Sequence, residues 1–248
     1  MKISIITVVM NAEATIADAI ESVAAQNYAD VEHIIIDGQS SDNTLGIIER
    51  YRDQIAHLVS EPDDGLYHAM NKGIALATGN VVGILNADDV YQDTTVLKQV
   101  AEAHADGMLD VVYANLVYVK SGDLGQVVRN WESCDYREGL SFDGWMPPHP
   151  TMFLKKHVYD KVGVFDTSLK YQSDLEFCTR LFEVHKAKSL YIPKLWVRMR
   201  LGGVTNNSLL TILKGNMESY QAMKKHGLRR NPLIFFLVKF SSRLKQYF

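Results

Sequence analysis

The sequence predicts an α/β fold in which helices cover both faces of a mostly parallel sheet. Strand-like and helix-like segments alternate along the first ninety residues, the pattern of repeated strand–helix–strand units. The strand-like segments are continuous apolar runs, as at residues 3–9 and 31–36, rather than alternating apolar and polar positions. Continuous runs are typical of strands buried on both faces, and such strands occur in parallel sheets.

Each element of the first half has its own signal. The expected helices carry apolar residues three and four positions apart, and Gly79 stops the third of them. In chain order, we expect strands at 3–9, 31–36, 57–59 and 81–85, with helices between them at 14–25, 44–51 and 65–77.

The second half has a looser pattern. Its turn-rich segment 122–144 favours a hairpin, and the prolines of 145–150 indicate a loop. The remaining expected elements are a helix at 91–104, a strand at 111–119, a helix ending near 164 and a helix at 175–185.

The chain divides into a domain over residues 1–206, with halves at 1–89 and 90–206, and a helical tail over 207–248. The tail has eight Lys and Arg residues against one acid, Glu218, so it carries +7 while the remainder carries −10. This distribution argues against nucleic-acid binding by the whole molecule. It predicts instead a tail that contacts an anionic partner.

Cysteine usage and apolar segments indicate the compartment. Cys134 and Cys178 lie far apart and have no zinc-type spacing, which fits a reducing cytoplasm. The first residues lack the cleavage site of a secretory signal. No apolar segment reaches the roughly 18 to 20 residues that cross a bilayer. We therefore expect a cytoplasmic protein without a transmembrane helix.

Polar side chains follow each expected strand of the first half. Asn11 follows the first strand, Asp37 the second, residues 61–64 the third, and Asp88 with Asp89 the fourth. The carboxyl ends of parallel strands share one edge, where α/β sheets bind ligands. Carboxylates crowded at that edge repel each other unless a cation offsets their charge. Oxygen ligands of this kind suit Mg²⁺ or Mn²⁺ held together with substrate phosphates; the alternative is that these acids cap helices and turns.

Four sequence segments in this order resemble the family 2 inverting glycosyltransferases of GT-A (Rossmann-like) fold, and most closely their bacterial surface-polysaccharide branch. The segments are SIITVVMN at 4–11, IIIDGQSSDNT at 34–44, SEPDDGLYHAMNKGIALATG at 60–79 and LNADD at 85–89. The resemblance continues through HPTMFLKK at 149–156, VGVFD at 162–166 and SDLEFCTRL at 173–181. It implies a nucleotide-binding half at 1–89, an acceptor-side half at 90–206, and transfer of a sugar from a nucleotide-sugar. UDP is the expected nucleotide, with GDP and dTDP as alternatives.

The resemblance also implies roles for matching residues. It places Thr7 and Asn11 near the base, Asp37 on the uridine, and Asp88 with Asp89 at the metal-binding motif, where Mn²⁺ or Mg²⁺ is expected. An asparagine at position 86 replaces the first acid of that motif. The sequence does not decide whether Asp88 or Asp89 contacts the ion. The full expected set of nucleotide-sugar-binding residues is Thr7, Asn11, Asp37, Asp63, Asn71, Lys72, Asn86 and Asp88.

Asp174 is the expected catalytic base. Inverting transfer needs a carboxylate that takes the proton of the attacking hydroxyl, and the resemblance places an acid at the start of a late helix in this role. The alternative is that Asp174 only caps that helix. Ser173 and Glu176 fit a capping box, however, and this predicts that Asp174 is free for chemistry.

The acceptor side and the tail have weaker signals. His149 and Arg200 are expected on the acceptor side, and the polysaccharide branch implies a glycan or lipid-linked acceptor. The tail segment 231–248 mixes large apolar and basic residues. Peripheral contact with the cytoplasmic face of the inner membrane is the favoured interpretation. Packing of the tail onto the body is the alternative.

Other function classes have less support. A dinucleotide-dependent dehydrogenase needs Gly-x-Gly-x-x-Gly after the first strand, and residues 9–12 contain no glycine. A sugar nucleotidyltransferase usually has an early glycine-rich basic loop, which is absent from this sequence. The remaining alternative is a non-catalytic protein that binds a nucleotide-sugar or a glycan. The presence of all four candidate aspartates argues against it; these are Asp37, Asp88, Asp89 and Asp174.

Overall fold

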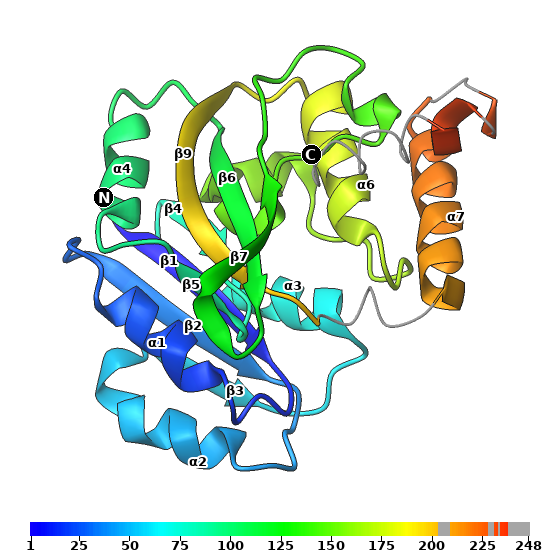
Figure 1. The fold of residues 1–248 in the computed structure, drawn as a ribbon. Helices are drawn as coiled ribbons and strands as arrows, with labels where there is room; N and C mark the ends of the chain where they lie inside the picture. The colour runs from blue at the N-terminus through cyan, green and yellow to red at the C-terminus, as the bar shows by residue number, and fades with distance from the viewer. Residues whose placement is uncertain (203–208, 228–230, 233, 238–248) are drawn as a thin grey trace.

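The computed structural model describes residues 1–202, 209–227, 231–232 and 234–237, with the backbone alone for 209–213. These residues form an α/β fold around one nine-stranded sheet, which confirms the predicted fold class (Figure 1). The predicted domain boundary at 206 and residues 238–248 of the predicted membrane-contacting segment lie outside the described residues.

The first four strands form the parallel part of the sheet. They are β1 (Ile3–Val9), β2 (Val31–Asp37), β3 (His57–Ser60) and β4 (Val81–Ile84). β1 pairs with β2 on one side and with β4 on the other, and β3 lies outside β2. All seven side chains of β1 are buried, because helices cover both faces of this central strand. The carboxyl ends of all four strands therefore meet at one edge.

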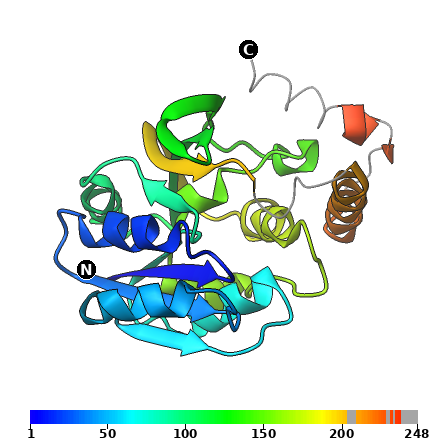
Figure 2. The same cartoon turned by 60° about the horizontal axis from the view of Figure 1, so that its bottom comes forward.

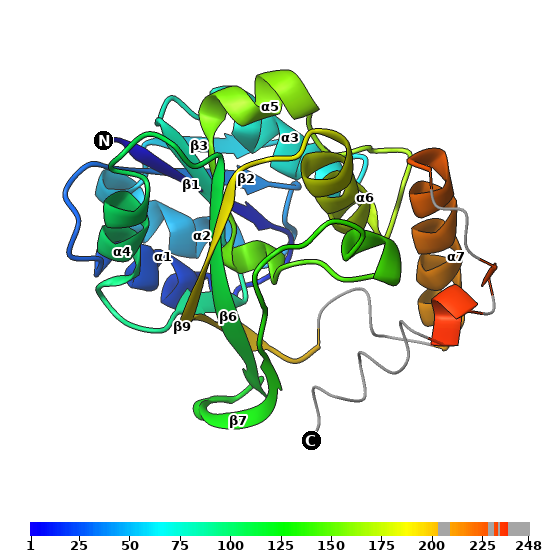
Figure 3. The same cartoon turned by 90° about the horizontal axis from the view of Figure 1, so that it is seen from above.

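The second half extends the sheet with mixed pairing. β8 is antiparallel to β4 and to β6, β9 is parallel to β6, and β5 is antiparallel to β9. β7 pairs with β6 in a hairpin that projects from the body (Figure 3). The hairpin expected within 122–144 is therefore wrong in its bounds, because that segment supplies only the second strand and the first strand is β6. The strands are β5 (Asp89–Tyr91), β6 (Val111–Lys120), β7 (Asp123–Trp131), β8 (Phe153–Lys155) and β9 (Ser189–Arg200).

Helices cover both faces of the sheet (Figure 2). One apolar cluster packs α3, α5 and α6 against one face, and two others pack α1, α2 and α4 against the opposite face. The helices on the first face are α3 (Leu66–Leu76), α5 (Lys156–Val162) and α6 (Ser173–Thr179), which continues into the π-helical turn η4 (Arg180–Val184). Those on the second face are α1 (Ile16–Ala24), α2 (Thr44–Ile48), which continues into the 3₁₀ turn η1 (Glu49–Gln54), and α4 (Val96–Ala103). Two further 3₁₀ turns, η2 (Ser141–Asp143) and η3 (His149–Thr151), precede β8.

The expected helix at 91–104 is shorter than predicted. It occupies only Val96–Ala103, because Asp89–Tyr91 pair as β5 with residues 197–199 of β9. The sequence gives no sign of this pairing, since the two segments are more than one hundred residues apart and β5 is only three residues long.

The described part of the tail packs on the body. Helix α7 (Leu209–Lys225) lies beside α6 (Figure 1), and Met223 and Phe235 bury their side chains against Leu175. Lys225 forms an ion pair of 3.1 Å with Asp166. This matches the alternative interpretation of the tail, while contact with a membrane stays a prediction. Within the described ranges, no helix has both the length and the apolar character needed to span a bilayer.

Candidate functional site

The loops after β1 and β2 are joined to each other. Asn11 has a positive φ of 51°, a conformation that asparagine tolerates better than most residues. Its backbone N–H donates to Ser40 Oγ at 2.8 Å, and its Oδ1 accepts the backbone N–H of Ser41 at 2.8 Å. Asn11 itself is exposed. The loop after β1 therefore has a defined shape and presents Asn11 to solvent.

Asp37 and Thr7 lie below this surface. The Asp37 carboxylate is completely buried at the end of β2 and accepts hydrogen bonds from the backbone N–H of Ser40 (3.1 Å) and from Ser60 Oγ (2.7 Å). Thr7 is also completely buried, and its Oγ1 lies 3.0 Å from His33 Nε2. Both side chains therefore hold together the loops and strands beneath the edge, and neither is open to solvent.

Lys72 forms ion pairs with two of the acidic residues that follow β3. Its Nζ lies 2.7 Å from Asp63 and 2.6 Å from Glu61, and these hydrogen bonds raise the pKa of Lys72 above its usual value. The second carboxylate oxygen of Asp63, Oδ2, is buried and has no hydrogen-bond partner in the structure. The site thus contains a fully charged ammonium group next to a carboxylate with one free oxygen.

Asn71 lies on the same helix and bonds to the opposite half of the chain. Its Nδ2 donates to the carbonyl oxygen of Phe165 at 2.9 Å, and its Oδ1 accepts the N–H of Phe165 at 3.0 Å. Both ends of the side-chain amide are therefore used within the protein. Asn71 ties α3 to the segment that precedes α6.

Two adjacent carboxylates follow β4. Burial raises the pKa of Asp88, and burial together with the charge of Asp88 raises the pKa of Asp89 further. Asp89 is completely buried, and its Oδ2 accepts a hydrogen bond of 2.9 Å from Asn86 Nδ2. Asp89 Oδ1 has no hydrogen-bond partner in the structure. A neighbouring cation would stabilise the charged forms of both carboxylates.

This donor set fits a divalent metal ion that has further ligands from a substrate. Within the described residues, no group of three or more His, Cys, Asp or Glu side chains is placed to hold a metal by itself. Mg²⁺ and similar ions commonly use only one or two carboxylates and complete their shell with water and phosphate oxygens. Asp88 is half-buried whereas Asp89 is fully buried, so Asp88 is the more accessible of the two.

Arg200 lies beside Asp88. Its Nη1 donates to the carbonyl oxygen of Asp88 at 2.8 Å, its Nε donates to the carbonyl oxygen of Ser121 at 3.2 Å, and its Nη2 pairs with Asp18. Each of the three guanidinium nitrogens thus contacts an oxygen of the protein. Arg200 links α1, the β6–β7 hairpin and the turn that carries Asp88.

Asp174 lies in the first turn of α6, and one of its two carboxylate oxygens accepts hydrogen bonds. Oδ1 accepts the hydroxyl of Tyr67 at 3.2 Å and the backbone N–H of Leu175 at 2.8 Å. Oδ2 lies 3.8 Å from His149 Nδ1, which is too long for a hydrogen bond. The Asp174 side chain is 20% exposed, so solvent reaches it.

The predicted capping box of Ser173 and Glu176 is wrong. Gln172 is the N-cap residue, no side chain caps the helix, and Ser173 Oγ is buried without a hydrogen-bond partner in the structure. Glu176 instead bonds Arg180 and, at 2.6 Å, His226. Glu176 does not bond back to the start of the helix, because Arg180 of η4 gives its buried carboxylate a cationic partner and the ring of His226 in the tail gives it a second contact.

A small cavity connects Asp174 with the end of β4. Its volume is about 20 Å³, and its lining includes Ile84, the last residue of β4, together with Asp174 and His149. Burial lowers the pKa of His149, and the charge of Asp174 offsets part of this effect. His149 Nε2 has no hydrogen-bond partner in the structure. The cavity shows that Asp174 and His149 lie next to the strand that leads to Asp88 and Asp89.

The structure therefore gathers the predicted residues into two groups. The loops after β1 to β4 carry the donor-side candidates, with Arg200 beside them rather than beside Asp174. Asp174 and His149 form the second group. Sequence reasoning missed Tyr67, whose only signal was its place one helical turn before Asn71.

Comparison with known proteins identifies the family. Residues 4–167 match the family described as Glycosyl transferase family 2. The chain is 37% identical over 184 residues to an uncharacterized glycosyltransferase of Mycobacterium tuberculosis, covering 72% of this chain and 68% of that protein. It is 26% identical over 189 residues to a PGL/p-HBAD biosynthesis glycosyltransferase of Mycobacterium bovis, covering 72% and 69%. The chain belongs to glycosyltransferase family 2.

Solved structures confirm the GT-A fold. TarS of S. aureus, in a fragment crystallised with UDP-GlcNAc, superimposes with a TM-score of 0.72 at 18% identity, covering 96% of this chain and 70% of the fragment. The chain spans 42% of a longer TarS structure. A mannosyltransferase of Pyrobaculum calidifontis, PcManGT, bound to GDP-Man and Mn²⁺, gives a TM-score of 0.67 at 18% identity, covering 93% and 65%.

Proposed function

We propose that this glycosyltransferase moves a sugar from a UDP-sugar to an acceptor hydroxyl, with inversion at the anomeric carbon and with Mn²⁺ or Mg²⁺. One observation carries the proposal: the pair Asp88 and Asp89 follows β4, while the separate carboxylate of Asp174 borders a cavity that Ile84 of the same strand also lines. Metal binding and proton abstraction need two carboxylate sites that are close but distinct.

The donor binds along the loops after β1 to β4. Exposed Asn11 and the loop that Asp37 supports from below face the nucleotide base, while Thr7 supports β1 from the interior. Lys72 offers its ammonium group to the diphosphate, and Asp63 acts on the donor indirectly by holding that ammonium group at 2.7 Å. Asn71 acts indirectly by holding α3 in place. The nucleotide-sugars bound to TarS and PcManGT support this class of donor.

The metal ion belongs next to Asp88. Asp88 is accessible and would contact the ion directly, Asp89 would support it through its unpartnered Oδ1, and Asn86 orients Asp89. When bound, the ion offsets negative charge on the departing diphosphate. The Mn²⁺ bound to PcManGT supports this part of the proposal.

Asp174 serves as the base. The acceptor oxygen attacks the anomeric carbon from the face opposite the diphosphate, and its proton passes to the Asp174 carboxylate. The bond between the anomeric carbon and the diphosphate oxygen breaks, and its electron pair leaves with the diphosphate. His149, beside Oδ2 of Asp174, lines the acceptor side.

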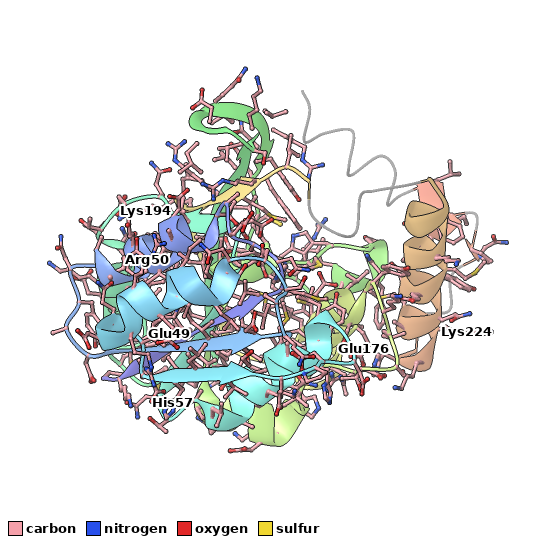
Figure 4. All side chains as sticks on the ribbon, turned by 90° about the horizontal axis from the view of Figure 1, so that it is seen from below. Glu49, Arg50, His57, Glu176, Lys194 and Lys224 are labelled. Carbon is pink, nitrogen blue, oxygen red and sulfur yellow. The ribbon has the colours of Figure 1, made fainter. Side chains whose placement is uncertain are left out.

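A glycan on a lipid carrier is the proposed acceptor, in bacterial polysaccharide assembly at the cytoplasmic face of the inner membrane. Ile234 and Leu237 of the tail are 53% and 68% exposed, and Lys224 lies on the side of α7 that faces away from the body (Figure 4). Exposed apolar and basic side chains together favour an anionic membrane surface. Vesicles of phosphatidylglycerol and phosphatidylcholine should sediment the wild-type protein but not the variant with Ile234→Glu and Leu237→Glu. Met108→Glu, at a distant residue that is also exposed, is the control.

Release of nucleoside diphosphate tests the central proposal. Purified protein is incubated with UDP-GlcNAc, UDP-glucose, UDP-galactose or GDP-mannose in the presence of Mn²⁺. We expect slow release of nucleoside diphosphate from one donor, and we expect EDTA or Asp88→Asn to abolish it. Asp53→Asn, at an exposed position on η1, is the matched control and should retain the rate. Binding without release across donors and acceptors would instead identify a nucleotide-sugar-binding protein, and formation of a nucleotide-sugar from a nucleoside triphosphate would identify a nucleotidyltransferase.

A further inference from the structure

Tyr67 is held in the core and bonds directly to Asp174. Its side chain is 6% exposed, and its ring packs against Phe165 with the ring centroids 5.5 Å apart. Phe165 packs in turn against Phe177 of α6 at 5.0 Å. From this position the Tyr67 hydroxyl donates to Asp174 Oδ1 at 3.2 Å. The contact joins two residues that are 107 positions apart in the sequence.

The position of Tyr67 is set by α3 and not by a substrate. Asn71 is four residues further along α3, so it lies on the same face of the helix as Tyr67. Its two hydrogen bonds to the backbone of Phe165 fix the helix against the segment before α6. The ring of Tyr67 and the amide of Asn71 therefore both hold Phe165. This double attachment leaves the hydroxyl little freedom to move away from Asp174.

The hydroxyl remains a donor at neutral pH. Burial raises the pKa of Tyr67 well above its usual value, and the negative charge of Asp174 raises it further. A protonated tyrosine next to a carboxylate donates to it, because the carboxylate can only accept.

The two oxygens of Asp174 have different surroundings. Oδ1 accepts two hydrogen bonds, from Tyr67 and from the Leu175 N–H. Oδ2 accepts none from the described residues, and Nδ1 of its neighbour His149 is 3.8 Å away. Each hydrogen bond stabilises negative charge on the oxygen that accepts it. Oδ2 is therefore the oxygen with a lone pair available for an incoming proton.

We propose that Tyr67 is a positioning residue, which holds Asp174 through Oδ1 so that Oδ2 faces the acceptor hydroxyl and takes its proton. This inference rests on the proposed function, because it assigns an atom to the base of that reaction. The proton moves from the acceptor oxygen to Oδ2 while that oxygen bonds the anomeric carbon. The electron pair of the broken bond leaves with the diphosphate.

Tyr67→Phe tests this role because it removes only the hydroxyl. The assay is release of nucleoside diphosphate, with Mn²⁺, from whichever of UDP-GlcNAc, UDP-glucose, UDP-galactose and GDP-mannose the wild type hydrolyses fastest. Loss of one hydrogen bond to a charged group should lower kcat by about tenfold, with KM for the donor unchanged within about twofold. Tyr113→Phe is the matched control: Tyr113 is completely buried, its hydroxyl donates to the carbonyl oxygen of Cys134 at 2.9 Å, and it makes no described hydrogen bond to Asp174. This control should retain the wild-type kcat.

A double-mutant comparison separates positioning from general damage. If Tyr67 acts through Asp174, adding Tyr67→Phe to Asp174→Asn should cause no further loss of kcat. Melting temperatures of all variants show whether each remains folded. Wild-type kcat in Tyr67→Phe, or the same tenfold loss in the Asp174→Asn background, overturns the role of Tyr67 and leaves the proposed function intact. Full activity of Asp174→Asn, or no release by the wild type from any donor, overturns the proposed function and this inference with it.

Discussion

Arg200 donates a hydrogen bond of 2.8 Å from Nη1 to the carbonyl oxygen of Asp88. The bond joins the last residue of β9 to the turn after β4, across 112 positions of sequence. The same guanidinium pairs with Asp18 and bonds Ser121. Arg200 thus holds the turn that carries the proposed metal ligand, without contacting the Asp174 group in the structure.

Replacing Arg200 by lysine should weaken metal binding. A lysine ammonium cannot reach the three oxygens that the planar guanidinium contacts, so the backbone of Asp88 loses its support. We expect the affinity for Mn²⁺ in the presence of UDP to fall by about tenfold, the lower end of the effect seen for groups that orient metal ligands. Calorimetric titration measures this affinity. Arg198→Lys is the control, because Arg198 bonds the carbonyl oxygen of Leu124 in the same hairpin and not Asp88. Equal affinities in both variants would contradict the prediction.

Asp174→Asn should separate donor binding from turnover. The amide keeps the size of the side chain and can still accept the hydroxyl of Tyr67, but it cannot take a proton at neutral pH. We expect kcat to fall by roughly one hundredfold or more, the contribution of a positioned base, and donor KM to change little. Steady-state kinetics of diphosphate release measures both constants, and Asp160→Asn at an exposed position on α5 should match the wild type. An unchanged kcat in Asp174→Asn would remove Asp174 from the base role.

Acid should destabilise the fold through His33. Burial lowers the pKa of His33 to about 4, whereas an unfolded chain has a histidine pKa near 6.5. The unfolded state therefore binds more protons than the folded state, so stability is complete above about pH 6.5 and is lost as the pH falls toward 4. Between pH 7 and pH 5 this group should cost about 2 kcal/mol of unfolding free energy. Burial also lowers the pKa of His104 and His149, which adds loss in the same direction.

Urea unfolding at pH 7 and pH 5 measures this dependence. His33→Gln should reduce the difference in unfolding free energy between the two pH values by about 2 kcal/mol, even if the variant is less stable at both. His185→Gln, at an exposed histidine, should leave the difference as it is in the wild type. An equal pH dependence in His33→Gln and wild type would show that His33 does not carry the effect.

The tail should contribute to stability through Phe235. This side chain is completely buried in the cluster with Leu175 and Met223. Phe235→Ala should therefore lower the unfolding free energy by about 3 kcal/mol, at the lower end of values for a buried aromatic residue. Leu237→Ala, two residues further on and 68% exposed, should change it by less than about 0.5 kcal/mol. Urea unfolding of both variants tests this contrast, and small effects from both would mean that the cluster does not stabilise the body.

Most of the parallel half of the fold could be predicted from local patterns. The continuous apolar runs of β1, β2 and β4 mark strands covered on both faces, and the polar residues after them mark the edge where ligands bind. Asp88 and Asp174 could be proposed as site residues because they belong to motifs that are short in sequence. Neither β5 nor β9 was predicted, because their pairing with distant strands leaves no local periodicity.

The sequence by itself determined the family, the four strands of residues 1–89 and the polar residues that follow them, since each depends on residues close together along the chain. Only the tertiary structure decided which of those polar side chains are open to a substrate. Thr7 and Asp37 are buried beneath the loops, and Arg200 bonds the backbone of Asp88. Tyr67 and His149 lie next to different oxygens of Asp174. Such contacts depend on how helices pack across the sheet, and packing joins residues whose separation in sequence carries no information about their distance in space.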